Sequence, residues 1–554
     1  MEWKTLQHNG ILIPPEYEPQ GIKIKIKGET VDLNPIQEEM AYQWAKKKDT
    51  QYAQDAVFQK NFTLDFVSAL DPKFKNTKYE DIDFSQAYRV VDIEKDRRER
   101  MTKEERKENA KKRKEKREEL KEKYGKAVMD GMEVEVGNYM AEPPGIFIGR
   151  GEHPLRGKWK TRITKKDVTL NLGKDAKVPD GDWAKIENNT KAMWLANWID
   201  GLTQKRKYVW LADTANIKQK KDKEKYEKAV RLAGEIEKIR NQIIEDMKSK
   251  DPKISKIATV CYLIYRTAMR VGDEKDPDEA DTVGATTLRK EHVKITEDTI
   301  EFDFLGKDSV RWQEKIQAKG HDKQFQENLK GLIQNKKPKD EIFENITSRD
   351  VNDYYKGIVK GLTAKVFRTY LATTVVKDSL KEYDNIKDKT PAEKLYYAKL
   401  ANLKAAKMCN HKRTIPKTFE TTLEKKRVKL KEKKTGKPWE KSEEVLKKVE
   451  EITPKTDKQI KSKKKRIKNL KDKIKKQKQR HKEQIEKLRL QIDLTEKTRD
   501  YNLGTSLRNY IDPRIFKSWT DEVGAEWEKL YTAALQKKFL WVKSENVSWN
   551  NLKK

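Results

Sequence analysis

Five residues in the central and C-terminal parts of the chain have side chains suited to phosphate-ester chemistry: Arg270, Lys307, Arg368, His411 and Tyr510. Guanidinium groups bind phosphate oxygens in a planar, bidentate geometry. Lysine and histidine can donate protons, and the phenol of a tyrosine can attack phosphorus. Together these side chains form a set that could transfer a phosphoryl group without a metal ion.

Tyr510 is the member of this set whose phenol could attack a phosphate, and its sequence neighbours bear on that possibility. Asp512 and Pro513 are of the types preferred at the N-cap and the first position of a helix, so Tyr510 should lie in a loop just before a helix. Arg508 and Arg514 are close in sequence and could bring a phosphate to the phenol. The alternative stays open that Tyr510 is a packing or surface residue, since the chain has 20 tyrosines.

Both arginines of the set belong to predicted helices. The apolar segment at about 257–270 predicts a buried helix that Arg270 closes. Arg270 there either complements the helix dipole or is held rigidly for a substrate phosphate. The segment 362–380 predicts a helix with one apolar side, in which Arg368 is embedded. A charged residue at such a position needs a partner if it is buried.

Lys307 and His411 are predicted at the ends of regular elements. Apolar and polar residues alternate over 293–304, which predicts a β-hairpin with Lys307 at its tip, where a lysine is usually only solvated. Thr390 to Glu393 form a capping box with proline at the first position, which starts a helix that reaches His411. Taken alone, this histidine fits a structural role better than a catalytic one.

The composition indicates a large, folded protein with a polyanionic partner. At 554 residues the chain is too long for one core, so we expect several domains. Its net charge of +34 suits a polyanion, and nucleic acid is the commonest one. A ribosomal or chromatin-type structural protein would carry a similar charge. The 13 tryptophans indicate folded cores, which a disordered basic tail lacks.

Cysteine usage and hydropathy exclude several other classes of protein. Cys261 and Cys409 lie in apolar helical segments and are predicted to be reduced core residues. The sequence has no CxxC pair, His/Cys cluster or HExxH motif, so we expect no zinc held by the protein. It also has no apolar run of membrane-spanning length and no signal peptide, so we expect no membrane contact.

The N-terminal part of the chain predicts a mixture of strands and helices. Isoleucines at 22, 24 and 26 alternate with lysine as in a strand, and a helix is expected at about 38–48. Trp3 and Trp44 predict a core for this region. The segment 94–124 is nearly all charged, with opposite signs interspersed, which predicts a solvated helix with ion pairs between successive turns; a projecting basic helix that lies along DNA is the alternative.

Three further segments lead into the centre of the chain. Residues 142–151 form a rigid, glycine-rich loop that could bring Arg150 to a base edge or a phosphate, or could be an ordinary surface turn. The tryptophan-rich segment 191–200 is predicted to be helical, and 217–248 to be a long helix with one apolar face. No GK[ST] follows the glycine-rich loop, so it is not a P-loop.

A basic coiled coil is predicted between about 421 and 497. Its segment 461–480 holds twelve basic residues and one acidic residue, Asp472, while its apolar residues keep a spacing of three to four. Breaks at 436–438 and 453–454 favour an antiparallel helical hairpin that protrudes from the protein. A plain spacer is the alternative.

Along almost the whole chain the sequence resembles eukaryotic-type DNA topoisomerase I, the type IB class, and seven segments between residues 142 and 514 carry the resemblance. They are EPPGIFIGRG at 142–151, RVGDEK at 270–275, ADTVG at 280–284, FDFLGKDS at 302–309, LTAKVFRTY at 362–370, CNH at 409–411 and LGTSLRNYIDPR at 503–514.

The resemblance implies a multidomain α+β fold that encircles DNA as a clamp. It implies a mixed α/β cap at 1–215 and a mainly α catalytic core with a β-hairpin at 216–416. An antiparallel coiled-coil linker at 417–497 and a small α-helical C-terminal domain at 498–554 would follow. The implied function is relaxation of positive and negative supercoils through a 3′-phosphotyrosine intermediate and strand rotation, without ATP, metal or any other cofactor.

The resemblance also assigns roles to individual residues. Tyr510 is the nucleophile, Arg270, Arg368 and His411 bind the non-bridging oxygens, and Lys307 protonates the leaving 5′ oxygen. Predicted DNA contacts are Arg150, Thr282, Lys275, Asp308 and Asn509. Arg150, Asp308 and Asn509 match positions that contact camptothecin in the family, so we expect this inhibitor to act on the cleaved complex. The partner is double-stranded supercoiled DNA, and a monomer is expected.

Localisation and two rival functions stay open. Family members in nucleated cells usually have a long charged N-terminal extension, and this chain starts almost at the clamp, which leaves a nucleus and a prokaryotic cytoplasm or nucleoid both open. A tyrosine recombinase would use the same chemistry, but it usually has histidine at the position of Lys365, and here a coiled coil separates His411 from Tyr510. A non-catalytic architectural DNA-binding protein would explain the charge but not the five-residue set.

Overall fold

The computed structural model describes residues 2–272 and 283–552, which form two compact units. Unit 1 comprises the described residues of Met1–Asp222 together with Leu305–Ser309. Unit 2 comprises those of Lys223–Asp273, Val283–Phe304 and Val310–Lys554. Both units contain helices and small sheets, which confirms the predicted multidomain α+β class.

Unit 1 is built from several small sheets and from helices of different lengths. One sheet has the order β1-β5-β6 (Leu6–His8, Lys126–Met129, Met132–Glu135), and a second has the order β3-β2-β4 (Glu29–Asp32, Lys23–Ile26, Ile82–Asp83). A third has the order β10-β9-β11-β12 (Lys185–Glu187, Thr169–Asn171, Trp194–Ile199, Arg206–Trp210), and β7 (Gly145–Ile146) pairs with β8 (Trp159–Lys160). Helices α1 (Pro35–Ala45) and α2 (Ala56–Ser68) pack with the second sheet around Trp44.

Most predictions for unit 1 are confirmed, and one is wrong. The predicted strand and helix correspond to β2 and α1, and both Trp3 and Trp44 are buried. The predicted tryptophan-rich helix at 191–200 is instead strand β11, which is antiparallel to β12 and to β9. Five of its six residues are buried, so the segment lacks the alternation that would have distinguished a central strand from a buried helix.

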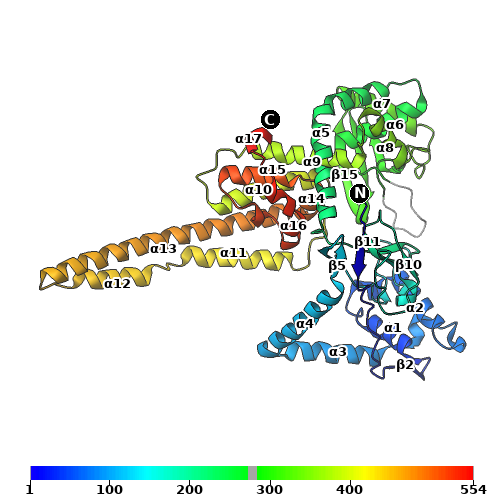
Figure 1. The fold of residues 1–554 in the computed structure, drawn as a ribbon, viewed down its shortest axis with the longest axis horizontal. Coiled ribbons are helices and arrows are strands. Elements are labelled where there is room, and N and C mark those ends of the chain that lie inside the picture. Colours follow the sequence, from blue (N-terminus) through cyan, green and yellow to red (C-terminus); the bar gives the residue numbers. More distant parts are fainter. Residues whose placement is uncertain (1, 273–282, 553–554) are drawn as a thin grey trace. The chain divides into compact units, whose positions relative to one another are not determined.

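The charged segment of unit 1 forms two helices, α3 (Ser85–Arg100) and α4 (Lys103–Tyr124), which meet at an angle in Figure 1. Thr102 begins the second helix through a capping box with Glu105. No residue of α4 is buried, and ion pairs link successive turns, such as Lys112 with Glu108 at 3.0 Å. The solvated, ion-paired character predicted for 94–124 is therefore confirmed, but the helix is interrupted at 101–102.

Two large hydrophobic cores lie in the described part of unit 2, and Phe419, Leu423 and Ile492 form a smaller third cluster. The first lies among α5 (Asn216–Asp246), whose first residues belong to unit 1, α6 (Pro252–Thr267), β13 (Val293–Ile295), β14 (Thr299–Gly306), β15 (Val310–Gln317), α7 (His321–Ile333), α8 (Ser348–Ile358) and the start of α9 (Ala364–Lys381). The second lies among the rest of α9, α10 (Pro391–Met408), α14 (Leu503–Asn509), α15 (Pro513–Val523), α16 (Ala533–Lys538) and α17 (Trp549–Leu552). Helix α9 therefore connects the two cores.

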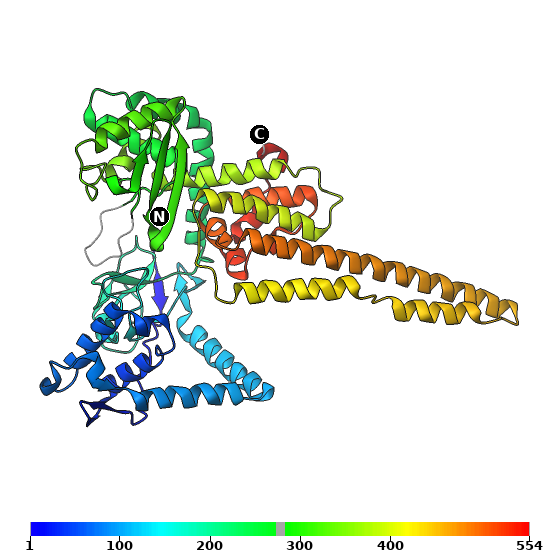
Figure 2. The same cartoon turned by 180° about the vertical axis from the view of Figure 1, so that it is seen from behind.

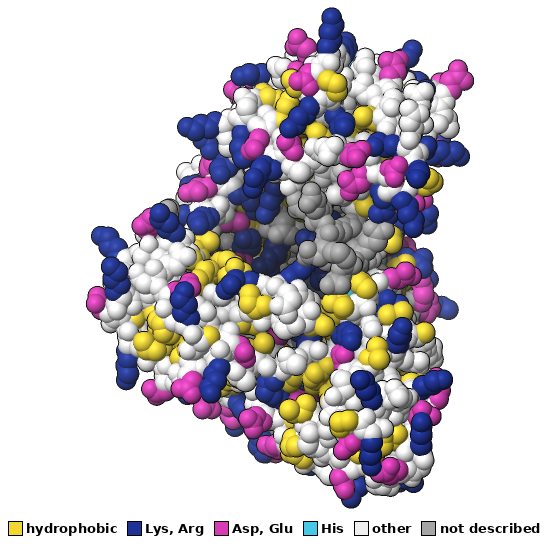
Figure 3. Space-filling view, turned by 90° about the vertical axis from the view of Figure 1, so that its right-hand side faces the viewer, with side chains coloured by type: hydrophobic (Ala, Val, Ile, Leu, Met, Phe, Trp, Pro, Cys, Tyr) yellow, Lys and Arg dark blue, Asp and Glu magenta, His cyan; other side chains and the backbone are white. Residues whose placement is uncertain are grey.

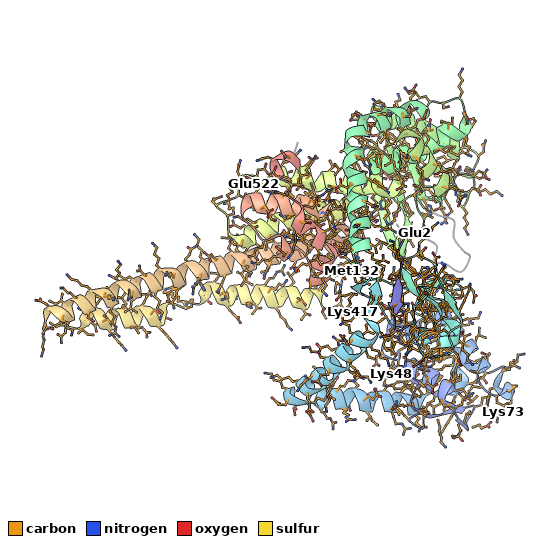
Figure 4. All side chains as sticks on the ribbon, viewed as in Figure 1. Glu2, Lys48, Lys73, Met132, Lys417 and Glu522 are labelled. Carbon is orange, nitrogen blue, oxygen red and sulfur yellow. The ribbon has the colours of Figure 1, made fainter. Side chains whose placement is uncertain are left out.

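Three helices form the predicted protruding hairpin: α11 (Phe419–Thr435), α12 (Glu440–Glu451) and α13 (Asp457–Lys497). Figures 1 and 2 show α13 running antiparallel to α11 and α12, away from the rest of unit 2. Lys417, labelled in Figure 4, lies just before the hairpin, and side chains project along its length. Ion pairs join the two arms, such as Lys478 with Glu443 at 2.7 Å and Arg427 with Glu496 at 2.6 Å.

The remaining whole-chain predictions concern cysteines, membranes and charge. Cys261 and Cys409 are free and buried. In the part of the chain that the structure describes, no helix is long and apolar enough to cross a membrane. On the face seen in Figure 3, Lys and Arg side chains are widely distributed, with Asp and Glu side chains among them.

Candidate active site

Tyr510 occupies a short turn between two helices of unit 2. It is the C-cap of α14, and its backbone N–H donates to the Ser506 carbonyl at 3.0 Å. Asp512 and Pro513 are the N-cap and first residue of α15, as the sequence predicted. The ring is half-buried and packs against other side chains, so Tyr510 does not lie in an open loop.

Four of the five predicted site residues lie together in unit 2. The imidazole of His411 stacks on the phenol of Tyr510, with ring centres 5.4 Å apart and planes at 24°. The Arg368 guanidinium lies over the same phenol, 4.9 Å from its centre. Arg270 is close enough for its charge to contribute to lowering the pKa of His411. The phenol of Tyr510 is thus in contact with an imidazole and a guanidinium, and a second guanidinium lies near that imidazole.

Arg368 is buried in α9 with a partial set of hydrogen bonds. Its side chain is 4% exposed, and its Nη2 donates to the Cys409 carbonyl. Its Nε has no hydrogen-bond partner among the described residues. A carbonyl oxygen leaves the positive charge of Arg368 uncompensated, so the buried guanidinium is suited to bind an anion.

His411 follows the end of α10 and is held by its backbone. Its N–H donates to Ala406 at 2.8 Å, and its carbonyl accepts from the Asn502 N–H at 2.7 Å. Burial, together with the charges of Arg368 and Arg270, lowers the pKa of His411 to about 3. Neither ring nitrogen has a hydrogen-bond partner in the described parts of the chain. His411 is therefore a neutral imidazole at neutral pH.

Arg270 lies beyond the helix that was predicted to end with it. Helix α6 ends at Thr267, and Ala268 takes the left-handed conformation with φ 51°. The backbone of Arg270 then runs beside a second segment, since its carbonyl accepts from the Ala285 N–H at 2.9 Å. The prediction that the helix ends at Arg270 is therefore wrong by three residues, and the backbone of Arg270 is held by the 285 segment and not by the helix.

Two other predictions near Tyr510 can be compared with the structure. Arg514, expected to bring phosphate to the phenol, is 8% exposed and binds Asp512 at 2.7 Å and Glu227 at 2.6 Å. Its charge is already compensated by carboxylates, so its role is to anchor the start of α15. Arg508 is exposed.

The sequence analysis missed the residues that hold α14 in place. The buried Asn402 of α10 donates from Nδ2 to the Leu503 carbonyl at 3.1 Å and accepts from the Ser506 hydroxyl at 2.7 Å. Lys225 of α5 donates to the Asn509 carbonyl at 3.3 Å. The only sign of Asn402 in the sequence is that it is a polar residue within an apolar helix. No local motif identifies the segment that it binds.

Lys307 lies in the turn Lys307–Ser309 at the tip of the β14–β15 hairpin, as predicted, and is exposed. This tip belongs to unit 1. The glycine-rich loop of unit 1 approaches it closely, because a Cβ on Gly151 would lie 2.1 Å from the Ser309 hydroxyl oxygen. Gly151 also has φ +59°, so two independent constraints favour glycine here. The loop that carries Arg150 therefore meets the tip that carries Lys307.

The other predicted DNA contacts are only partly described. Asn509 is the half-buried last residue of α14, and its Nδ2 donates to the Thr505 carbonyl at 3.1 Å. Arg150 is exposed. Thr282, Lys275 and the side chain of Asp308 lie outside the described residues. Within the described ranges, no group of three or more His, Cys, Asp or Glu residues could hold a metal ion.

The fold and the site together define a multidomain α+β protein with a tyrosine beneath a buried arginine and beside an imidazole, a set suited to phosphate-ester chemistry. Its sequence matches three families: "Eukaryotic DNA topoisomerase I, DNA binding fragment" over residues 1–211, "Eukaryotic DNA topoisomerase I, catalytic core" over 214–445, and "C-terminal topoisomerase domain" over 482–551.

Curated relatives agree with these matches. The chain is 36% identical to DNA topoisomerase 1 of Homo sapiens over 556 residues. This alignment covers 98% of the chain and 71% of the human protein. The chain is 37% identical to the Mus musculus enzyme, covering 98% and 70%, and 37% identical to DNA topoisomerase 1 beta of Arabidopsis thaliana, covering 98% and 58%. The chain therefore belongs to the eukaryotic DNA topoisomerase I family, and it is an isomerase that acts on DNA.

Proposed function

We propose that the protein relaxes both positively and negatively supercoiled DNA as a type IB topoisomerase, with Tyr510 as nucleophile. The observation that carries the proposal is the stacking of Tyr510 on neutral His411 beneath the Arg368 guanidinium. The partner is double-stranded supercoiled DNA, and the enzyme acts as a monomer.

In the proposed cleavage step, the Tyr510 oxygen attacks a backbone phosphorus and the bond from phosphorus to the 5′ oxygen breaks. Arg270, Arg368 and His411 bind the non-bridging oxygens, where charge builds up in the transition state. A well-aimed donor typically contributes ~3–4 kcal/mol to such stabilisation. Neutral His411 contributes through a ring N–H, which either tautomer supplies.

Proton transfers complete the step. In this proposal the phenol proton leaves to water, which acts as the base. Lys307 gives a proton to the leaving 5′ oxygen, so the products are a 3′-phosphotyrosine and a 5′-hydroxyl. Religation reverses each transfer. One phosphodiester is exchanged for another, so the reaction needs neither ATP nor an obligatory metal or other cofactor.

The larger elements have proposed roles in holding and turning DNA. The chain would encircle the duplex with a cap at 1–215 and a catalytic core at 216–416, linked through 417–497 to a C-terminal domain at 498–554. Arg150, Lys275, Thr282, Asp308 and Asn509 would contact DNA. The basic hairpin α11–α13 would slow rotation of the free strand electrostatically, because its many lysines face a polyanion.

The test is relaxation of negatively and positively supercoiled plasmid in EDTA without ATP, comparing wild type with Tyr510→Phe. Relaxation of both signs by wild type alone is the expected result. Equal activity of the two proteins would place the nucleophile elsewhere. Binding without relaxation by either protein would favour an architectural DNA-binding role, and strand exchange between duplexes would favour a recombinase.

A further inference from the structure

Thr373 of α9 makes two hydrogen bonds that leave its own helix. A threonine within a helix commonly bonds the carbonyl four residues earlier, as Thr369 does to Lys365 at 3.0 Å. The Thr373 hydroxyl instead donates to the Tyr510 carbonyl at 3.2 Å and accepts from the Asp512 N–H at 3.1 Å. These two bonds join α9 to the turn that carries the proposed nucleophile.

The two hydrogen bonds complete the attachment of this turn. The N–H groups of Tyr510 and Ile511 donate to the Ser506 carbonyl at 3.0 and 3.1 Å, so α14 holds one side of the turn. Thr373 binds the other side, at the carbonyl of Tyr510 and the N–H of Asp512. The direction in which the phenol leaves the backbone is set by this turn, so its orientation depends on both attachments.

Helix α9 also carries Arg368, whose guanidinium lies over the Tyr510 ring. One rigid helix therefore carries both the buried cation and the hydroxyl that holds the nucleophile's backbone. A helix keeps side chains five positions apart at a constant relative placement. The distance between Arg368 and Tyr510 then varies little, as catalysis by prearranged groups requires.

We infer that Thr373 is a positioning residue that fixes the phenol of Tyr510 relative to Arg368 and His411. This inference rests on the proposed function, because it gives Thr373 a purpose only if Tyr510 is the nucleophile. Thr373 transfers no proton and touches no reacting atom. Its effect should appear in the rates of both cleavage and religation, since the same phenolic oxygen attacks in one direction and leaves in the other.

The experiment compares Thr373→Val, Thr373→Ser and Thr369→Val in the full chain. Valine has nearly the shape of threonine but cannot hydrogen-bond, and serine keeps the hydroxyl. Thr369→Val is the matched control, because it removes a hydroxyl of the same helix that bonds only within the helix. The substrate is a DNA duplex whose cleaved strand ends shortly beyond the cleavage site, so that the released piece diffuses away.

Thr373→Val is expected to lower the single-turnover cleavage rate by about 10- to 100-fold, the range expected when a reacting group is misplaced by up to 1 Å. Its religation rate should fall similarly, and its Kd for DNA should stay within about twofold of wild type. Thr373→Ser keeps the hydroxyl, so its cleavage rate should be within about threefold of wild type. The control Thr369→Val should also cleave at a rate within about threefold of wild type.

A wild-type cleavage rate in Thr373→Val would overturn the inference. Equal slowing of Thr373→Val and Thr373→Ser would also overturn it, because the hydroxyl would then not be what matters. Tyr510→Phe is measured alongside them. If that variant still cleaves DNA, the proposed function fails and the inference fails with it, whereas an inactive Tyr510→Phe with an unaffected Thr373→Val rejects the inference alone.

Discussion

Two arginines of unit 2 are similarly buried but differ in what neutralises them. Arg514 binds the carboxylates of Asp512 and Glu227, which satisfies its charge inside the protein. Arg368 donates to a backbone carbonyl and keeps a buried Nε without a partner among the described residues. Burying a cation without a counter-charge destabilises a protein, so such a residue implies a ligand that supplies the charge. Burial and the nearby positive charge of Arg368 also disfavour a protonated His411, so this neighbouring imidazole is neutral.

The titration of His411 provides the first prediction. Burial, with the charges of Arg368 and Arg270, lowers its pKa from 6.5 to about 3. The unfolded chain therefore takes up a proton below pH 6.5 that the folded protein does not, and stability falls as the pH decreases from 6.5 towards 3. Between pH 8 and pH 5 this site should reduce the free energy of unfolding by roughly 2 kcal/mol.

NMR of the histidine rings measures this directly, with the His411→Gln spectrum used for assignment. The His411 signals should not shift between pH 8 and pH 5 in the folded protein, and they should titrate near the ordinary value in urea. A folded-state midpoint near 6.5 would contradict the prediction. The His411→Gln variant should lose less stability than wild type over the same pH range.

At the scale of elements, the site depends on segments that pack backbone against backbone. Gly272 and Gly284 lie in the two adjacent segments that follow α6, and a Cβ on Gly284 would be 2.5 Å from the Gly272 Cα and N. Gly272 has φ +89°, which side chains rarely allow. These glycines let the chain after Arg270 run directly beside 284–286. The placement of Arg270 therefore depends on the absence of two side chains.

Gly284→Ala tests this dependence. The added methyl group should push the Arg270 segment aside, destabilise unit 2 by about 1–3 kcal/mol and slow cleavage by about 10- to 100-fold. Thermal unfolding and single-turnover cleavage measure the two effects.

The control for that experiment is Gly331→Ala in α7, where the new Cβ would meet nothing within 4 Å. Alanine favours a helix over glycine by about 0.5–1 kcal/mol, so this variant should be slightly more stable and fully active. Wild-type cleavage by Gly284→Ala would show that the close approach does not position Arg270.

At the scale of the whole molecule, the proposed functional residues come from both units. Lys307 and Arg150 belong to unit 1, whereas Tyr510, Arg368, His411, Arg270 and Asn509 belong to unit 2. The proposed reaction requires groups from both units at one phosphate. The DNA substrate is a polyanion and the chain has a net charge of +34, so the protein and DNA attract each other electrostatically.

Camptothecin provides a test at this scale, because its predicted contacts, Arg150, Asp308 and Asn509, are distributed over both units. With wild type, the drug should increase nicked plasmid in proportion to its concentration after the reaction is stopped with detergent. Tyr510→Phe should give no nicks with or without drug. Relaxation by wild type without any drug-stabilised nicking would contradict the proposed inhibitor site while leaving the relaxation mechanism intact.

The sequence by itself determined the local elements with strong signals. The cap formed by Asp512 and Pro513, the capping box at Thr390, the hairpin tip at Lys307 and the basic helical hairpin all depend on neighbours within a few residues. The segment 191–200 was misassigned because a fully buried strand and a buried helix share an apolar composition, and only pairing with β9 and β12 distinguishes them.

Only the tertiary structure decided which charges are free to act. From the sequence, both Arg514 and Arg368 could bind a phosphate. In the structure, carboxylates of α5 and of the start of α15 neutralise Arg514, whereas Arg368 lies over the Tyr510 ring and near His411. The hydrogen bonds of Thr373 and Asn402 likewise join residues about a hundred or more positions apart. Electrostatic and hydrogen-bonding partners depend on distance in space, which local sequence patterns do not encode.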